Sequence, residues 1–136
     1  MMKRTKLRIP EGGAIEDNPG MTMEQYSEIM KKQLGREYLR FADNVVKKVN
    51  PLENSIVLEI GPGPGWAGIY LLKKRKDLKL IGLDTSPDMI RVASENATKE
   101  GFPDIVFIQG SAENMSEIND DTFDLVISRD SLHHWE

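Results

Sequence analysis

The chain has 136 residues, a formal net charge of −4 and no cysteine, with 39% hydrophobic and 29% charged residues. This length suits one compact domain, and the balanced composition is typical of a folded chain rather than a disordered one. The absence of cysteine excludes disulfides, thiolate zinc sites and a cysteine nucleophile. The negative charge argues against a general nucleic-acid-binding surface. No secretory signal or bilayer-length apolar run is found, so a cytoplasmic location is expected.

The N-terminal part of the chain is predicted to be an irregular segment followed by helix. Residues 1–20 contain several prolines and glycines, which break any regular pattern. Residues 22–49 carry apolar side chains at every third or fourth position, which predicts one helix or two helices separated at Gly35. The pattern ends at Asn50, because the following proline disfavours helix in the residue before it.

The remainder of the chain alternates between short apolar runs and amphipathic segments. Strands are predicted over residues 55–60, 79–83, 105–108 and 123–128, and helices over residues 66–76 and 86–100, with an acidic connection over 112–121. Ser86 is expected to cap the second of these helices, and Gly101 to follow its end. This alternation implies parallel strands joined by right-handed crossovers. We therefore expect a cap segment over 1–50 and an α/β half-domain over 51–136.

A glycine-rich loop lies at the turn between the first strand and the helix after it. Its sequence is Gly61-Pro62-Gly63-Pro64-Gly65. Glycine allows the backbone to turn tightly there and to approach a ligand, and the next helix directs free N–H groups at that ligand. A dinucleotide-binding fingerprint requires a glycine where Trp66 stands, and the bulk of this tryptophan would obstruct close helix–strand packing.

Two acidic residues accompany the loop. Asp84 ends the second strand, where a carboxylate can accept hydrogen bonds from ribose hydroxyls; alternatively, it caps the next helix. Glu59 stands inside an otherwise apolar strand, where a buried acid is costly unless it is paired. It either organises the loop without touching a ligand or lies close to a cationic ligand.

Four segments in chain order resemble the class I, Rossmann-like S-adenosylmethionine-dependent methyltransferases. They are residues 57–66, which are similar to motif I, residues 80–90, the adenine-side loop 109–113 and the fourth-strand motif 123–128. Residues 131–135 resemble the small-molecule branch of this family, including ubiquinone/menaquinone C-methyltransferase-like enzymes. The resemblance covers residues 55–135, and four segments together are more specific than any one of them.

The resemblance implies a binding site for S-adenosylmethionine. The implied residues are Glu59, Gly61, Pro62, Gly63 and Gly65 around the methionine part, Asp84 at the ribose, and Thr85, Ser86 and Met89 beside ribose and adenine. Ser111, Ala112 and Glu113 are implied at the adenine edge, Ser128 and Arg129 at the side of the cleft, and Tyr26 as a cover. Ser111 stands where the family often has an acid, which puts adenine recognition by that side chain in doubt.

The fold implied by the resemblance is a doubly wound parallel sheet with helices on both faces, of which this chain holds strands 3-2-1-4. The family fold continues through three more strands, so we expect a C-terminally shortened chain, as a fragment or as a short form. The fourth strand would then be an open edge, normally a liability, and a homo-oligomer would cover it.

The reaction implied is methyl transfer to a small-molecule acceptor, with S-adenosylhomocysteine as product and neither a nucleic acid nor a membrane as partner. Positioning of donor and acceptor supplies much of the rate in such chemistry, so no metal site is expected. His133 and His134 are candidate bases, although packing, capping or solvation is the simpler role. The basic run 73–76 is interpreted as a solvated helix end. Two alternatives remain: a cofactor-binding module without turnover and, less favoured because of Trp66, an NAD-dependent oxidoreductase.

Overall fold

The computed structural model describes residues 20–111 and 122–128. The elements are α2 (Met23–Asn44), a π-helical turn η1 (Val45–Val49), β1 (Ile56–Ile60), α3 (Trp66–Lys74), β2 (Lys79–Asp84), α4 (Pro87–Lys99), β3 (Val106–Gln109) and β4 (Leu125–Ile127). Every predicted strand is present, with bounds that differ from the prediction by at most two residues. The interpretation of residues 112–121 as an acidic connection lies outside the described residues.

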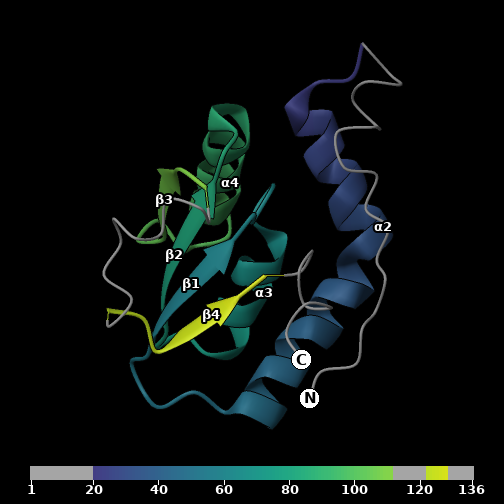
Figure 1. Cartoon of the computed structure of the whole chain (residues 1–136). Coiled ribbons are helices and arrows are strands. Elements are labelled where there is room, and N and C mark those ends of the chain that lie inside the picture. The colour runs from purple at the N-terminus through teal and green to yellow at the C-terminus, as the bar shows by residue number, and fades with distance from the viewer. Residues whose placement is uncertain (1–19, 112–121, 129–136) are drawn as a thin grey trace.

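The four strands form one parallel sheet in the order β3-β2-β1-β4 (Figure 1). Leu58 of β1 lies opposite Ile81 of β2 and Val126 of β4. This order confirms the predicted 3-2-1-4 arrangement. The carboxyl ends of β1 and β2 therefore meet at one edge of the sheet, which is where ligands bind in open α/β sheets.

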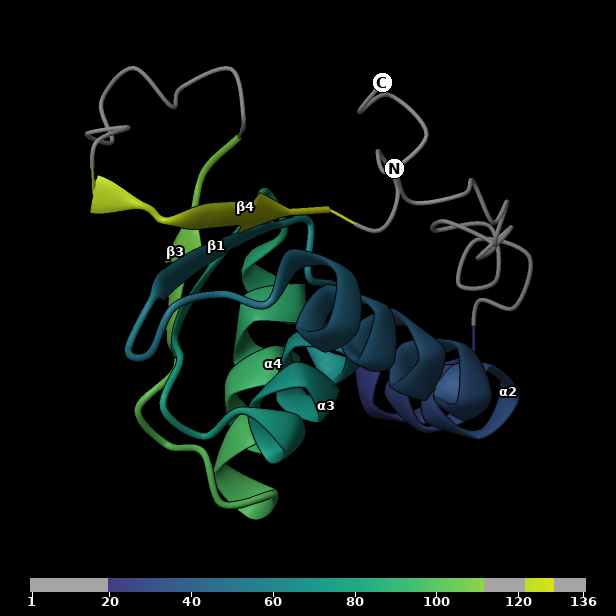
Figure 2. The ribbon, with the colours of Figure 1, turned by 90° about the horizontal axis from the view of Figure 1, so that it is seen from below.

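The helices α2, α3 and α4 pack on the same side of the sheet (Figure 2). Two successive right-handed crossovers that move along the sheet in one direction place their helices, α3 and α4, on one face. Helix α2 packs against both of them. Within residues 20–111 and 122–128, no helix lies on the other face of the sheet. The expectation of helices on both faces therefore stays a prediction.

Helix α2 runs through Gly35 without interruption, so the alternative of two helices separated there is wrong. Its start is fixed by a capping box, in which the Thr22 hydroxyl accepts from the Gln25 N–H and the Gln25 side chain accepts from the Thr22 N–H. One glycine in a helix costs only about 1 kcal/mol. Burial of one face of α2, which includes Tyr38 and Phe41, offsets this cost.

Within the described residues, a hydrophobic cluster joins the helices to most of the sheet. It combines side chains from all three helices and from β1, β2 and β4, among them Tyr38, Val57, Ile69, Leu80 and Ile127. Helix α2 therefore belongs to the same core as the sheet and lies next to the start of α3. None of the helices within the described residues is long and apolar enough to cross a membrane.

Candidate functional site

The glycine loop between β1 and α3 is built from left-handed backbone. Gly61, Gly63 and Gly65 have φ angles of +67°, +56° and +88°, which other residues rarely adopt. A Cβ atom added at Gly61 or Gly63 would meet no atom of the described residues within 4 Å, so among these residues the loop presents bare backbone to open space. At Gly65 the same atom would lie 3.1 Å from the Cβ of Ala93, because the loop rests on α4 there.

Backbone hydrogen bonds hold this loop to the edge of the sheet. The N–H of Gly61 donates to the carbonyl of Leu83 in β2 at 2.8 Å. The N–H of Gly65 donates to the carbonyl of Pro62 at 3.0 Å, which closes the turn. The loop therefore has a defined shape that is set by β2 and by its own backbone.

Asp84 connects the loop to the start of α4. Its Oδ2 accepts from the N–H of Gly63 at 3.0 Å, and its Oδ1 accepts from the N–H of Ser86 at 3.0 Å. The cap of α4 is Ser86, whose hydroxyl accepts from the N–H of Met89 at 3.2 Å, so the alternative of Asp84 as the helix cap is wrong. Each carboxylate oxygen can accept a further hydrogen bond, so Asp84 retains capacity for hydroxyl donors.

Glu59 is buried beneath α3, with only 2% of its surface exposed. A Cβ at Gly68 would lie 2.6 Å from Oε1 of Glu59 and 2.4 Å from Cδ2 of Leu80. Gly68 thus allows α3 to approach β1 and β2 closely, and sequence analysis missed it. Trp66 does not obstruct this packing, because its side chain is directed towards α2. There its indole N–H donates to the carbonyl of Ser27 at 3.0 Å.

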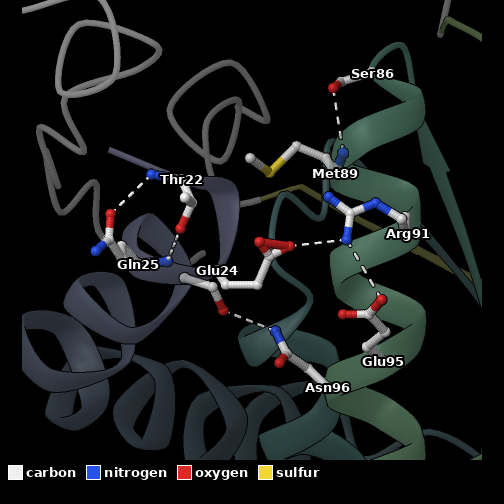
Figure 3. Close-up of polar contacts among 9 residues, drawn as sticks. Thr22, Glu24, Gln25, Ser86, Met89, Arg91, Glu95 and Asn96 are labelled. Carbon is white, nitrogen blue, oxygen red and sulfur yellow. Dashed lines mark hydrogen bonds and ion pairs between the residues drawn. The ribbon is translucent and has the colours of Figure 1, made fainter. Parts of the chain in front are cut away.

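The other predicted site residues that the structure describes share this edge of the sheet. They are Thr85, which is exposed, Ser86 and Met89, which are half-buried at the start of α4 (Figure 3), Ser111, which is half-buried after β3, and Ser128, which is buried after β4. Tyr26 is buried in α2. Ala112, Glu113, Arg129, His133 and His134 lie outside the described residues.

Sequence analysis also missed two buried polar residues behind the loop. The side-chain amide of Asn96 in α4 donates to the Ser27 hydroxyl at 2.8 Å and to the Pro64 carbonyl at 2.9 Å. The available signal was position: Asn96 falls among Val92, Ala93 and Ala97 on the buried face of α4. A polar residue on such a face indicates a specific hydrogen-bonding partner.

The basic run at the end of α3 is paired with acids. Lys73 lies 2.5 Å from Glu100, Lys74 lies 2.5 Å from Asp43, and Arg75 forks onto Asp77 at 2.9 Å. Hydrogen bonding to these lysines lowers the pKa values of Glu100 and Asp43. Three of the four cations in the run 73–76 are therefore in ion pairs, which reduces its free positive charge. No cluster of three metal-ligating side chains occurs in the part of the chain that the structure describes.

Comparison with known proteins gives consistent matches. A family model described as a methyltransferase domain matches residues 57–136. Erythromycin 3''-O-methyltransferase from Saccharopolyspora erythraea is 33% identical over 96 residues, which cover 70% of this chain and 31% of that protein. Ribosomal RNA small subunit methyltransferase A from Francisella tularensis subsp. novicida is 35% identical over 85 residues, which cover 60% of this chain and 31% of that protein.

A solved structure supports the same assignment. The crystal structure of a proposed S-adenosyl-L-methionine-dependent methyltransferase from Methanococcus maripaludis aligns with a TM-score of 0.72 and 27% identity, over 100% of this chain and 57% of that one. The chain spans about a third of the length of the two curated relatives, 31% of each. The glycine loop, the 3-2-1-4 sheet and these matches agree: the chain belongs to the class I S-adenosylmethionine-dependent methyltransferase family.

Proposed function

We propose that the chain binds S-adenosylmethionine at the carboxyl edge of its sheet, and that the protein transfers the methyl group to a small-molecule acceptor. The observation that carries this proposal is the Asp84 carboxylate, held by the N–H groups of Gly63 and Ser86 beside a loop of bare backbone. Family membership supports the choice of cofactor.

The chemistry of the site fits this cofactor. The Asp84 carboxylate is an acceptor for the two ribose hydroxyls, and its two backbone donors keep it oriented. Open space next to Gly61 and Gly63 suits a ligand that approaches the backbone closely. Met89, half-buried beside this edge, offers an apolar surface to the adenine ring.

The bound cofactor would supply an activated methyl group on a sulfonium. The chain's own task would then be to hold donor and acceptor in line and to keep water out, which needs no nucleophilic side chain. Ser128 is buried directly after β4, at the same edge, and is proposed to border the cleft near the methyl group.

A small molecule is favoured over a nucleic acid as the acceptor. The formal net charge is −4, and three cations of the basic run at 73–76 are engaged by acids. Binding to a nucleic acid depends on clustered free cations of the protein, which neutralise phosphates and release the counterions of the nucleic acid. The relatives themselves are named for erythromycin and for ribosomal RNA, so the acceptor must be tested directly.

The test is a calorimetric titration of the full chain with S-adenosylhomocysteine, with NADH as the comparison ligand. Saturable binding of S-adenosylhomocysteine alone is expected. Binding of NADH alone would replace this proposal with an oxidoreductase. Transfer of a labelled methyl group to small molecules, with an RNA transcript tested in parallel, then decides the acceptor class, and methylation of the RNA alone would overturn the small-molecule assignment.

A further inference from the structure

Three buried polar side chains gather behind the glycine loop, where three helices meet. Ser27 of α2 is 2% exposed, Trp66 of α3 is 3% exposed and Asn96 of α4 is 6% exposed. Buried polar groups are costly unless their hydrogen bonds are made, so such a group is usually retained for a specific arrangement.

Asn96 is the residue of this group that touches the loop. Its amide nitrogen donates to the Pro64 carbonyl at 2.9 Å and to the Ser27 hydroxyl at 2.8 Å. The Pro64 carbonyl is an acceptor only, so the amide nitrogen, rather than the amide oxygen, must face it. Both hydrogens of the Asn96 amide are therefore engaged.

The Pro64 carbonyl belongs to the peptide group that leads into Gly65, the left-handed residue that caps α3. A hydrogen bond to this carbonyl helps to fix the plane of that peptide, whose own N–H, at Gly65, donates to the Pro62 carbonyl at 3.0 Å. Ala93, about one helical turn before Asn96, lies so close to Gly65 that a Cβ there would be 3.1 Å away. The same face of α4 therefore meets the loop at Gly65 and at the Pro64 carbonyl.

The same group ties the loop to α2. The Ser27 carbonyl accepts from the Trp66 indole at 3.0 Å, and the Ser27 hydroxyl accepts from Asn96. A second link between α2 and α4 is the ion pair of Glu24 and Arg91 at 2.8 Å (Figure 3), whose side chains are about half exposed and which includes no residue of the loop. The structure thus offers an internal comparison between a link that includes the loop and one that does not.

We propose that Asn96 is a positioning residue for the cofactor: it holds the Pro64–Gly65 peptide in its binding orientation and couples the affinity of the site to the docking of α2. The proposal rests on the proposed function for its ligand. Loss of the amide leaves the Pro64 carbonyl and the Ser27 hydroxyl buried without that donor, which favours rotation of the loop peptide.

The experiment compares four variants of the full chain by calorimetric titration with S-adenosylhomocysteine and by unfolding in urea. Asn96→Ala removes both donors, and Ser27→Ala removes only the hydroxyl acceptor. Val92→Ala is the stability control, because Val92 is 1% exposed on the same helix and is not among the loop's hydrogen-bonding partners. Glu24→Gln weakens only the surface link.

Asn96→Ala is expected to lower the affinity for S-adenosylhomocysteine about tenfold, and Ser27→Ala to lower it less. Val92→Ala should lose stability while it keeps its affinity, and Glu24→Gln should change neither by much. A loss of affinity in Val92→Ala that equals the loss in Asn96→Ala at matched stability would overturn the proposal, as would wild-type affinity in Asn96→Ala.

A second readout needs no ligand. Hydrogen exchange at the Gly65 N–H and at the Trp66 indole N–H is followed by NMR. The chain has two tryptophans, so a Trp135→Phe background leaves the Trp66 indole as the only indole signal. Faster exchange at both groups in Asn96→Ala, but not in Val92→Ala, is expected. Failure of the wild-type chain to bind S-adenosylhomocysteine would refute the proposed function, and this exchange pattern would still decide the role of Asn96. Should Asn96→Ala not fold, Ser27→Ala decides by the same comparison.

Discussion

Gly63 donates its backbone N–H to the carboxylate of Asp84 at 3.0 Å, across 21 positions of the chain. The bond joins the end of β1 to the end of β2, which lie side by side in the parallel sheet. Two features that stand apart in the sequence, a glycine loop and an acid at a strand end, are thus parts of one site. The acid orients the loop, and it is also the residue that we propose for the ribose hydroxyls.

Gly68→Ala should destabilise the chain by about 1–3 kcal/mol, the usual cost of overpacking a core. The added Cβ would lie 2.4 Å from Leu80 and 2.6 Å from the Glu59 carboxylate. Gly35→Ala is the matched control, since Gly35 is a helical glycine and no atom in the described part of the chain lies within 4 Å of the added Cβ. It should stabilise the chain by roughly 0.5–1 kcal/mol. Urea unfolding measures both, and equal effects would contradict the packing seen at Gly68.

Gly65→Ala should cost more stability than Gly101→Ala, although both glycines have positive φ angles, +88° and +93°. An alanine at position 101 has open space and is penalised only by about 1–2 kcal/mol for its backbone conformation. At position 65 the Cβ would also press on Ala93 at 3.1 Å, and α3 or α4 would have to shift. Thermal unfolding of the two variants separates backbone strain from crowding, and a larger loss in Gly101→Ala would be inconsistent with this geometry.

Asp77, which bonds to Asn54 just before β1, makes the free energy of unfolding depend on pH. Its carboxylate accepts from the Arg75 guanidinium and from the Asn54 N–H, and these bonds hold its pKa well below the usual 3.8. A carboxyl whose pKa is lower in the folded state contributes stability above the unfolded-state value and loses it as pH falls below about 4. Asp77→Asn should therefore be less stable than wild type at pH 7, and the difference should shrink towards pH 3.

Urea unfolding at several pH values measures this difference. Asp104→Asn, a change at an exposed aspartate, is the control and should differ little from wild type at either pH. A constant gap between wild type and Asp77→Asn from pH 7 to pH 3 would show that the contacts of Asp77 are not electrostatic in origin.

The strand order and the position of the loop followed from the sequence because both depend on local patterns. Short apolar runs gave the strands, and glycine at a strand end marked the turn. Ser86 was recognisable as the α4 cap because capping is also local, and the structure bears this out. The continuity of α2 through Gly35 was not predictable in this way, because it depends on core packing by residues such as Tyr38.

The contacts behind the loop could not be predicted from the sequence, for the same reason. Gly68 has a defined role only because Glu59 and Leu80 lie under it. Asn96 and Ser27 are 69 positions apart and meet only when α2 docks on α4. The bulk of Trp66 served only as an argument against a dinucleotide-binding loop, and the bond from its indole to α2 is a contact that no spacing pattern reports. Long-range partners of single polar side chains require the folded structure.

The most direct test of cofactor binding at Asp84 is calorimetric titration of Asp84→Ala and Asp88→Ala with S-adenosylhomocysteine. Asp84 accepts from the N–H groups of Gly63 and Ser86 and is the proposed ribose-binding residue, whereas Asp88 is exposed in the first turn of α4. We expect saturable binding by wild type and by Asp88→Ala, with affinity reduced about tenfold or more in Asp84→Ala, since hydrogen bonds to charged groups contribute about 1.5–3 kcal/mol. Equal affinities in the two variants, or no binding by the folded wild-type chain, would contradict this expectation.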